Sequence, residues 1–241
     1  MVALPSKTIH IGVVTVNRVT DHGKPDGRKT APKNYLVESV SSLVGPGGLS
    51  KYRDGRVSIS LFDSGSSDVS YIEPVADLFD SVHLSSNRIT LCQNVVRALR
   101  VGVASGTDYV AVIQDDVLWY RGSFEFIYRW VASAEFRYAF LSVYPCYGTT
   151  QRGFYSGCVR VDPSNYWGSM AVLFKPRFAA RCASFISERP GADKDDLKMA
   201  AWAGRNRLPI YTPAGKPRIG HIGDFSSLYE QKRRAYPGKI K

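Results

Sequence analysis

The chain has 241 residues, 44% of them hydrophobic, and Lys plus Arg outnumber Asp plus Glu by 32 to 21, a formal net charge of +11. This length and composition predict one large domain and exclude a repeat or low-complexity chain. The apolar run at the N-terminus is too short for a signal peptide, and no stretch approaches the roughly 20 apolar residues of a membrane span, so we expect a cytoplasmic protein. The excess of positive charge favours a polyanionic partner, either nucleic acid or an anionic membrane surface.

The first half of the chain alternates predicted strands with predicted helices. Thr8 to Val16 is an apolar run typical of a parallel strand buried on both faces, and it ends at Asn17-Arg18, where an α/β sheet would place a ligand-binding turn. Arg56 to Phe62 alternates as a second strand and leads into Asp63, which either accepts a hydrogen bond from a nucleotide or only stabilises a turn. The other predicted elements of this half are helices over Tyr35–Leu43, Tyr71–Phe79 and Ile89–Val103 and a strand over Ser81–Leu84.

The most informative stretch is Asp108 to Tyr120. Its apolar run Tyr109–Ile113 has the length of a strand and stops at Gln114-Asp115-Asp116. Carboxylates at the end of a buried strand are costly to desolvate without a positive partner. A divalent cation such as Mg²⁺ or Mn²⁺, whose shell is completed by substrate phosphates, would supply that charge. The alternative is that Asp115 and Asp116 only cap the next element.

The second half continues the alternation with less regular connections. A Gly-, Tyr- and Ser-rich stretch, Pro145–Asn165, is predicted to be a loop that faces the substrate. Asp195 and Asp196 precede a predicted helix from Leu197, where capping is the alternative to a catalytic role. His221 stands alone between glycines in a polar segment. The remaining predicted elements are helices over Ser123–Ala134 and Pro176–Ile186 and strands over Tyr138–Tyr144 and Met170–Phe174.

Taken in order, these features resemble the metal-dependent GT-A glycosyltransferases. Gln114-Asp115-Asp116-Val117 resembles their DXD element, with Gln in place of the first acid, and a Trp-Gly stretch, a second acidic pair and the late His221 follow in the same order. The resemblance implies a single α/β GT-A (Rossmann-like) domain with a mixed, mainly parallel central sheet flanked by helices. We expect a nucleotide-sugar half over residues 1–120, an acceptor half over 121–228 and a basic tail over 229–241.

More narrowly, three segments resemble the N-acetylglucosaminyltransferase IV family. Tyr35-Leu36, Ser39 and Ser42-Leu43 are similar to its YLxxTLxSL helix, and Gln93-Asn94 is similar to the QN that precedes its metal strand. The segment from Pro217 through His221-Ile222-Gly223 to Ser226-Ser227-Leu228 is similar to its PSLFQHVGxxSSL segment. That family is anchored in the secretory pathway and carries long extra segments, whereas this chain is compact, strongly basic and without a predicted anchor.

The resemblance implies an inverting transfer from a UDP-sugar that depends on Mn²⁺ or Mg²⁺. It assigns the metal to Asp116 and His221, with Asp115 acting indirectly. An inverting transfer also needs a base, which would be Asp195 or Asp196, with Asp195 preferred. The residues assigned to the nucleotide and the sugar are Thr15, Asn17, Arg18, Asp63, Gln93, Asn94, Asp115, Trp167, Gly168 and Ser169.

Positive charge gathers in a loop over residues 17–34 and in a tail over 231–241, and both would hold phosphates unless they are only solvated. The residues assigned to nucleic acid are Lys24, Arg28, Lys29, Lys33, Lys232, Arg233 and Arg234. In these respects the chain resembles viral enzymes that glycosylate hydroxymethylated bases such as 5-hydroxymethylcytosine, so duplex DNA is the expected partner and the host cell cytoplasm the expected location. The alternatives are a cytosolic transferase for a glycan or lipid-linked acceptor, and a catalytically inactive nucleic-acid-binding module.

Overall fold

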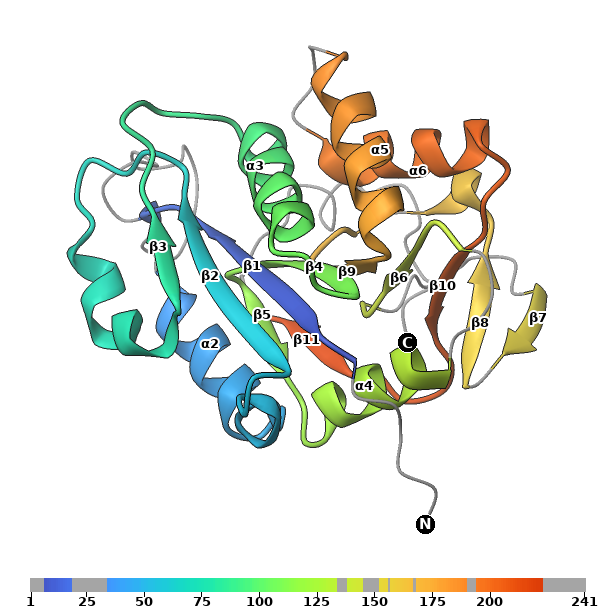
Figure 1. The fold of residues 1–241 in the computed structure, drawn as a ribbon, viewed down its shortest axis with the longest axis horizontal. Helices are drawn as coiled ribbons and strands as arrows, with labels where there is room; N and C mark the ends of the chain where they lie inside the picture. Colours follow the sequence, from blue (N-terminus) through green and yellow to red (C-terminus); the bar gives the residue numbers. More distant parts are fainter. Residues whose placement is uncertain are drawn as a thin grey trace, which may run out of the picture.

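A computed structural model of the chain describes residues 7–18, 34–133, 138–144, 152–155, 157–166, 168–189 and 194–222. Within these residues, one sheet has the strand order β3-β2-β1-β4-β9-β6-β10-β8-β7, and a small second sheet pairs β11 with β5. Helices cover both faces of the large sheet (Figure 1). The predicted α/β fold, a mixed sheet flanked by helices, is therefore confirmed.

The first part of the large sheet is parallel. It consists of β1 (Ile9–Thr15), β2 (Val57–Asp63), β3 (Ser81–His83) and β4 (Tyr109–Gln114). β1 runs between β2 and β4 and is buried along its whole length, as its continuous apolar run predicts for a strand that is covered on both faces. The register places Thr15 beside Asp63 and Val14 beside Gln114, so the polar ends of three strands meet at one edge of the sheet.

The second part of the large sheet mixes strand directions. It consists of β6 (Phe140–Ser142), β7 (Arg152–Tyr155), β8 (Cys158–Val161), β9 (Ala171–Phe174) and β10 (Ile210–Pro213). β9 is antiparallel to both β4 and β6, β10 is parallel to β6, and β8 is antiparallel to β10. The prediction of a loop over Pro145–Asn165 is wrong for the part that the structure describes. Four-residue strands are too short to show a period-2 pattern within Gly- and Tyr-rich sequence, and here pairing decides the conformation.

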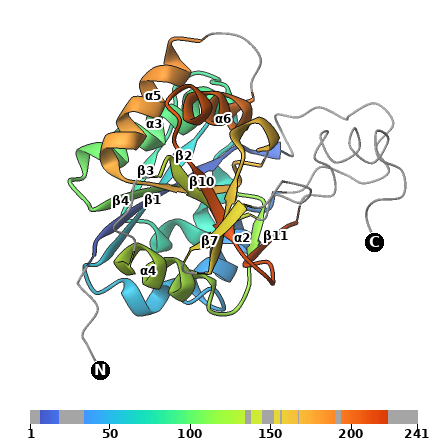
Figure 2. The same cartoon turned by 90° about the vertical axis from the view of Figure 1, so that its right-hand side faces the viewer.

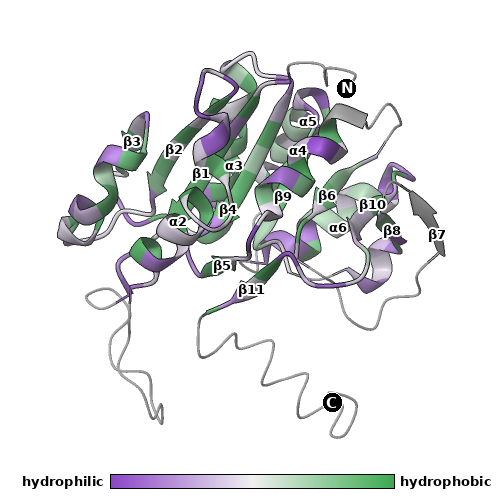
Figure 3. Ribbon diagram, turned by 90° about the horizontal axis from the view of Figure 1, so that it is seen from below, coloured by the Kyte–Doolittle hydropathy of each residue, from purple (hydrophilic) through white to green (hydrophobic). Residues whose placement is uncertain are grey.

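The helices form two layers. α2 (Leu36–Val44) and α4 (Ser123–Ser133) lie on one face of the sheet, and α3 (Leu91–Ala104), α5 (Pro176–Ser187) and α6 (Asp195–Arg205) lie on the other (Figures 1 and 2). Short 3₁₀ helices are η1 (Leu49–Tyr52), η2 (Ser70–Leu78) and η3 (Pro163–Asn165). β4 serves both layers, because Ala111 and Ile113 pack in the α2 and α4 core while Val110 and Val112 pack against α3 and α5. Figure 3 shows the hydrophobic colour that runs along β1 and β4.

The small sheet brings the C-terminal part of the described chain to the centre. β5 (Val117–Trp119) follows the acidic pair directly, and β11 (Ile219–His221) pairs with it in antiparallel fashion, His221 opposite Val117. Neither three-residue strand was predicted. The segment around His221 is polar in sequence, yet Ile219 within it is 1% exposed because pairing with β5 buries it.

Helix boundaries differ from the predicted ones at the site. The helix predicted from Leu197 begins at Asp195, so both Asp195 and Asp196 belong to its first turn. α3 begins after Thr90, which forms a capping box with Gln93. Among the described residues, no helix has the length and apolar character needed to cross a bilayer.

Candidate active site

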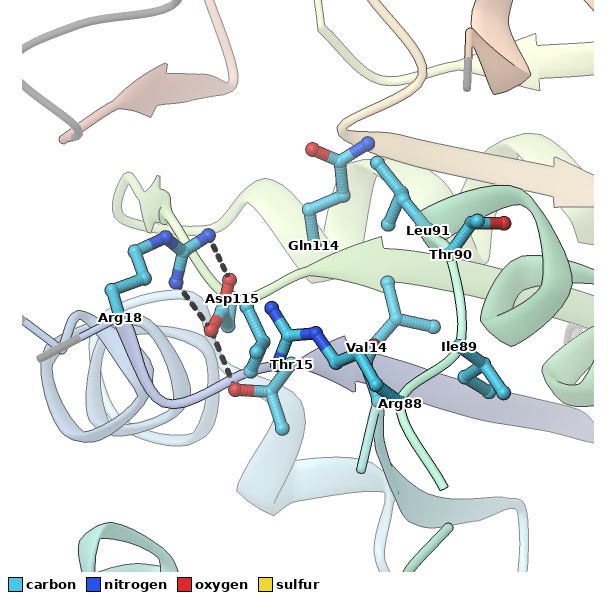
Figure 4. Close-up of a pocket in the computed structure, with 11 residues that line it drawn as sticks. Val14, Thr15, Arg18, Arg88, Ile89, Thr90, Leu91, Gln114 and Asp115 are labelled. Atoms are coloured by element: carbon cyan, nitrogen blue, oxygen red, sulfur yellow. Dashed lines mark hydrogen bonds and ion pairs between the residues drawn. The ribbon is translucent and has the colours of Figure 1, made fainter. Parts of the chain in front are cut away.

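A cavity of about 450 Å³ opens at the edge where β1 and β4 end. Its wall includes Thr15, Arg18, Arg88, Gln114 and Asp115 (Figure 4). Open α/β sheets bind ligands in the crevice outside the carboxyl ends of their strands. The volume lies within the range of about 300–1,000 Å³ typical of small-molecule sites. Three residues that were assigned to the nucleotide, Thr15, Arg18 and Asp115, thus share one cavity.

Asp115 is 2% exposed, and its negative charge is balanced within the protein. Arg18 donates from Nη1 to Asp115 Oδ2 and from Nη2 to Oδ1, both at 2.6 Å (Figure 4). Thr15 Oγ1 donates to the same carboxylate at 2.5 Å. Burial alone would lower the pKa of Arg18, but the charge and hydrogen bonds of Asp115 raise that pKa above its ordinary value. Asp115 therefore orders Arg18 and Thr15 along the wall of the cavity.

The neighbouring Asp116 faces His221. The Nε2 atom of His221 lies 3.1 Å from Asp116 Oδ2, and the two side chains are 18% and 15% exposed. The main chain fixes this approach, because the Ile222 N–H donates to the Asp116 carbonyl at 3.0 Å. Burial alone would raise the pKa of Asp116, but the hydrogen bond with His221 and the charge of Arg18 hold that pKa below its usual value. The Asp116 carboxylate is therefore ionised at neutral pH.

These two side chains fit a divalent cation. Adjacent ligands about 2.1 Å from an octahedral metal lie about 3 Å apart, close to the 3.1 Å between His221 Nε2 and Asp116 Oδ2. Asp116 Oδ1 is buried without a hydrogen-bond partner among the described residues, and a cation would satisfy it. No group of three or more potential ligands from His, Cys, Asp and Glu occurs in the part of the chain that the structure describes. Asp116 and His221 would thus leave most of the coordination sphere to phosphate oxygens and water.

The second acidic pair lies at the start of α6, with Asp195 4% and Asp196 5% exposed. Asp195 accepts a hydrogen bond from the Ser169 hydroxyl, and Gln114 Nε2 donates to the same hydroxyl at 3.2 Å. Asp196 instead accepts backbone N–H groups, from Gly168 at 3.0 Å and from the residue that follows it at 2.8 Å. Side chains thus connect Asp195 to the end of β4, whereas Asp196 is occupied by the main chain.

This chain is similar to known proteins in its three-dimensional structure and not in its sequence. No protein-family model matches the sequence, and no curated protein is significantly similar to it. The structure of S. aureus TarS matches 94% of this chain and 38% of its own, with 12% identity and a TM-score of 0.52. GalNAc-T7 with UDP, GalNAc and Mn²⁺ matches 91% of this chain and 44% of its own, with 10% identity and a TM-score of 0.62. The chain has a GT-A-like fold.

A third structure, a mannose-1-phosphate geranyltransferase from Thermus thermophilus, matches 88% of this chain and 76% of its own, with 11% identity and a TM-score of 0.50. Identities of 10% to 12% show a common fold and no more. The chain spans 38% of the TarS chain and 44% of the GalNAc-T7 chain. The predicted similarity to GT-A glycosyltransferases is thus confirmed for the fold, and the chemistry rests on the site itself.

Two other predicted nucleotide ligands stabilise turns next to the cavity. Asp63 is 1% exposed, and its carboxylate accepts the N–H groups of Gly65 and Ser66 and the hydroxyl of Tyr71, the last at 2.8 Å. Asn17 is 2% exposed; its backbone N–H donates to Ser66 Oγ at 2.8 Å, and its side-chain amide donates to the Asp68 carbonyl at 2.9 Å. Both side chains shape the GT-A-like edge in this arrangement, and their contact with a nucleotide stays a prediction.

Gln93 and Asn94 lie in the first turn of α3. The Gln93 side chain accepts the Thr90 N–H at 2.8 Å, which completes the capping box. Asn94 is completely buried and donates to the Phe62 carbonyl at 2.7 Å and to Ser64 Oγ at 2.9 Å. Asn94 therefore fixes the end of β2 relative to α3, and any effect on a nucleotide would pass through the backbone that it holds.

Several predicted residues lie outside the described part of the chain. They are Trp167 and the residues assigned to nucleic acid, namely Lys24, Arg28, Lys29, Lys33, Lys232, Arg233 and Arg234. Sequence reasoning also missed Arg88, which lines the cavity together with Arg18 (Figure 4). The sequence shows only that Arg88 directly precedes a predicted helix. This position does not distinguish an arginine that binds a ligand from one that is exposed to solvent. Gln114 was regarded only as a departure from an acidic residue, whereas it lines the cavity and contacts Ser169.

Proposed function

We propose that the protein is a metal-dependent, inverting glycosyltransferase that moves a sugar from a UDP-sugar to a hydroxyl acceptor. The observation that carries the proposal is the pair Asp116 and His221, which face each other at 3.1 Å. Asp116 directly follows Asp115, which lines a cavity of about 450 Å³ at the carboxyl edge of a GT-A-like sheet. The similar structure of GalNAc-T7 contains UDP, GalNAc and Mn²⁺, which supports the choice of donor and metal. The inverting course and the UDP-sugar rest on the resemblance to the N-acetylglucosaminyltransferase IV family.

In this proposal the donor occupies the cavity, with its diphosphate towards Asp116. Asp116 and His221 would hold Mn²⁺ or Mg²⁺, and the bound cation would stabilise the charge that develops on the diphosphate leaving group. Arg18 and Arg88 line the same cavity and offer positive charge to the phosphates. Thr15, Asn17 and Asp63 shape the nucleotide side of the cavity, and Gly168 and Ser169 border the sugar.

The reaction then needs one proton acceptor on the other side of the sugar. The acceptor oxygen forms a bond to the anomeric carbon, the bond from that carbon to the diphosphate breaks with its electron pair going to UDP, and Asp195 takes the hydroxyl proton. Asp195 is preferred over Asp196 because both oxygens of Asp196 accept backbone N–H groups, whereas Asp195 contacts the Ser169 hydroxyl. Ser169 and Gln114 would hold Asp195 in position relative to the end of β4.

For the acceptor, we propose a hydroxymethylated base in duplex DNA. The support is the net charge of +11 and its concentration in the loop 17–34 and the tail 231–241. A base inside a duplex must be flipped out of the stack before its hydroxymethyl group can reach Asp195. In this division of labour, residues 1–120 bind the donor, residues 121–228 bind the acceptor base, and the tail over 229–241 contacts phosphates.

The test is transfer from a panel of UDP-sugars, with Mn²⁺, to duplex DNA that contains 5-hydroxymethylcytosine, measured by nucleoside mass spectrometry. The same duplex with unmodified cytosine and an Asp116→Asn variant serve as controls. A hexose or N-acetylhexosamine mass gain on the modified base, absent in both controls, is the expected result. Metal-dependent loss of one donor without a mass gain on DNA would retain the enzyme and reject the DNA acceptor in favour of a glycan or lipid-linked one. Binding of DNA without loss of any donor would indicate an inactive module and contradict the proposed function.

A further inference from the structure

Arg18 forms ion pairs with both carboxylates of the acidic pair, Asp115 and Asp116. Its guanidinium forms two parallel hydrogen bonds of 2.6 Å with the Asp115 carboxylate, and Nη2 also lies 3.6 Å from Asp116 Oδ2. A planar fork bonded to both oxygens of a carboxylate is the most specific arrangement that an arginine can make. Arg18 thus supplies the positive charge that the two adjacent carboxylates need before any ligand binds.

Contacts with Asn34 and Tyr35 also hold Arg18 in this position. The backbone N–H of Arg18 donates to Asn34 Oδ1 at 2.8 Å, and this hydrogen bond fixes the backbone just after β1. The guanidinium carbon lies 5.6 Å from the centre of the Tyr35 ring, within the distance of a cation–π contact. The side chain is 22% exposed, so the ion pair is partly shielded from water, and its attraction is less screened than that of a surface pair.

This position places Arg18 in competition with a cation on Asp116. Two carboxylates and one guanidinium leave a single net negative charge, which is weak attraction for a divalent ion that must lose part of its water shell. The same Asp116 oxygen already has His221 Nε2 at 3.1 Å and Arg18 Nη2 at 3.6 Å. A diphosphate in the cavity would change this balance, because its negative charges can pair with both the metal and the guanidinium.

We propose that Arg18 is an internal counter-cation that keeps the acidic pair from binding a metal alone and admits the metal together with a nucleoside diphosphate. This inference rests on the proposed function. It makes the binding of the metal and of the diphosphate cooperative, with Arg18 as the residue that produces the coupling. A matching consequence is that removal of the Arg18 charge strengthens metal binding in the absence of nucleotide and weakens the gain that nucleotide brings.

The test is a titration of the full chain with Mn²⁺, in which free Mn²⁺ is followed by electron paramagnetic resonance, with and without UDP. For the wild type, UDP is expected to tighten Mn²⁺ binding at least ten-fold. Arg18→Gln is expected to bind Mn²⁺ alone about ten-fold more tightly than the wild type and to gain less than three-fold from UDP. Arg129→Gln is the matched control, because it removes one arginine charge at a residue that pairs with Glu125 on the surface, and it should behave like the wild type.

The outcomes separate this inference from the proposed function. Equal Mn²⁺ affinities of wild type and Arg18→Gln without UDP would overturn the role of Arg18. If UDP nevertheless tightened Mn²⁺ binding ten-fold in both proteins, the proposed metal site would still be supported. No Mn²⁺ binding by either protein, with or without UDP, would overturn the metal site and the inference together. Should Arg18→Gln fail to fold by circular dichroism, Arg18→Lys decides. Lysine cannot form the two parallel bonds, so Mn²⁺ alone should bind about three-fold more tightly than to the wild type, and equal affinity would overturn the inference.

Discussion

Asp195 and Asp196 are neighbours in the sequence, but their carboxylates have different partners. Asp195 is bonded to the Ser169 hydroxyl, and through it to Gln114, whereas Asp196 accepts the Gly168 N–H at 3.0 Å. Gly168 has a φ of +90°, a backbone conformation that residues other than glycine rarely adopt, and its N–H is the group that Asp196 binds. Asp196 therefore supports the backbone, and within the proposed function Asp195 is the residue that we expect to take the proton.

Replacement of each aspartate by asparagine should therefore have a different effect. Asp195→Asn is expected to lower the rate of sugar transfer by about 100-fold or more, the usual contribution of a general base, with little change in stability. Asp196→Asn is expected to cost about 1 kcal/mol of unfolding free energy through its weakened backbone hydrogen bonds and to retain more activity. The measurements are steady-state UDP release and urea unfolding. The assignment is wrong if the activity loss of Asp196→Asn exceeds that of Asp195→Asn.

His10 illustrates a residue that affects stability rather than chemistry. It is 4% exposed in β1, its Nδ1 lies 2.9 Å from Ser58 Oγ, and its Nε2 is buried without a hydrogen-bond partner among the described residues. Burial lowers the pKa of His10, and nearby His83 lowers it further, while Asp80 acts in the opposite direction. Burial also lowers the pKa of His83. The folded protein therefore holds His10 neutral.

A lowered histidine pKa predicts that acid destabilises the fold. Above the ordinary pKa of 6.5, His10 is neutral in both the folded and the unfolded protein. As the pH falls below 6.5, His10 binds a proton in the unfolded protein but stays neutral in the folded protein. The free energy of unfolding should thus fall from pH 7.5 to pH 5.5, by at most about 1.4 kcal/mol per pH unit for this group. His10→Gln, which cannot titrate, should lose less over the same interval in urea unfolding. Identical pH dependence in both proteins would show that His10 does not contribute.

At the scale of elements, the site depends on how closely α3 lies against the central strands. A Cβ on Gly102 of α3 would come within 2.4 Å of Val110 Cγ1 in β4, and a Cβ on Gly12 of β1 would come within 2.9 Å of the Ala98 Cβ in α3. Two glycines, one on the helix and one on a strand, thus allow the close approach. That approach also lets Asn94 reach the end of β2 and sets α3 at the cavity wall.

Gly102→Ala should consequently destabilise the fold. The added methyl has no space against Val110, and overpacking in a core typically costs about 1–3 kcal/mol. Gly204→Ala is the matched control, because its Cβ would make an ordinary contact of 3.5 Å with Pro163 near the end of α6. There the substitution should be neutral or stabilise by up to about 1 kcal/mol through the higher helix propensity of alanine. Thermal unfolding of both variants checks the contrast, and equal effects would contradict the packing argument.

The same elements show what the sequence can and cannot predict. β1 and β4 were predictable because a strand covered on both faces needs a continuous apolar run, and the acidic pair was noticeable because it interrupts such a run. β5 and β11 have three residues each, too few for any periodic signal, and they pair although the whole segment between Trp119 and Ile219 separates them in the sequence. His221 was consequently assigned to the metal by resemblance to a family, whereas its contact with Asp116 follows from that pairing.

At the scale of the whole molecule, the candidate site joins the two proposed halves. Arg18 and Asp116 come from the half that would bind the donor, while Ser169, Asp195 and His221 come from the half that would bind the acceptor. The strand order explains this meeting, because β9 of the second half pairs directly with β4.

The most direct test of this account is UDP release from a UDP-sugar by metal-free protein, before and after addition of Mn²⁺, in the wild type and in Asp116→Asn and His221→Gln. We expect release only with the divalent cation, and a loss of at least roughly 100-fold in each variant at saturating donor, because Asp116→Asn removes the anionic ligand and His221→Gln removes the imidazole ligand. Thermal unfolding of the variants should stay close to that of the wild type. Release that is equally fast without a divalent cation, or unchanged in Asp116→Asn, would contradict the central claim that Asp116 and His221 form the metal site of a glycosyltransferase.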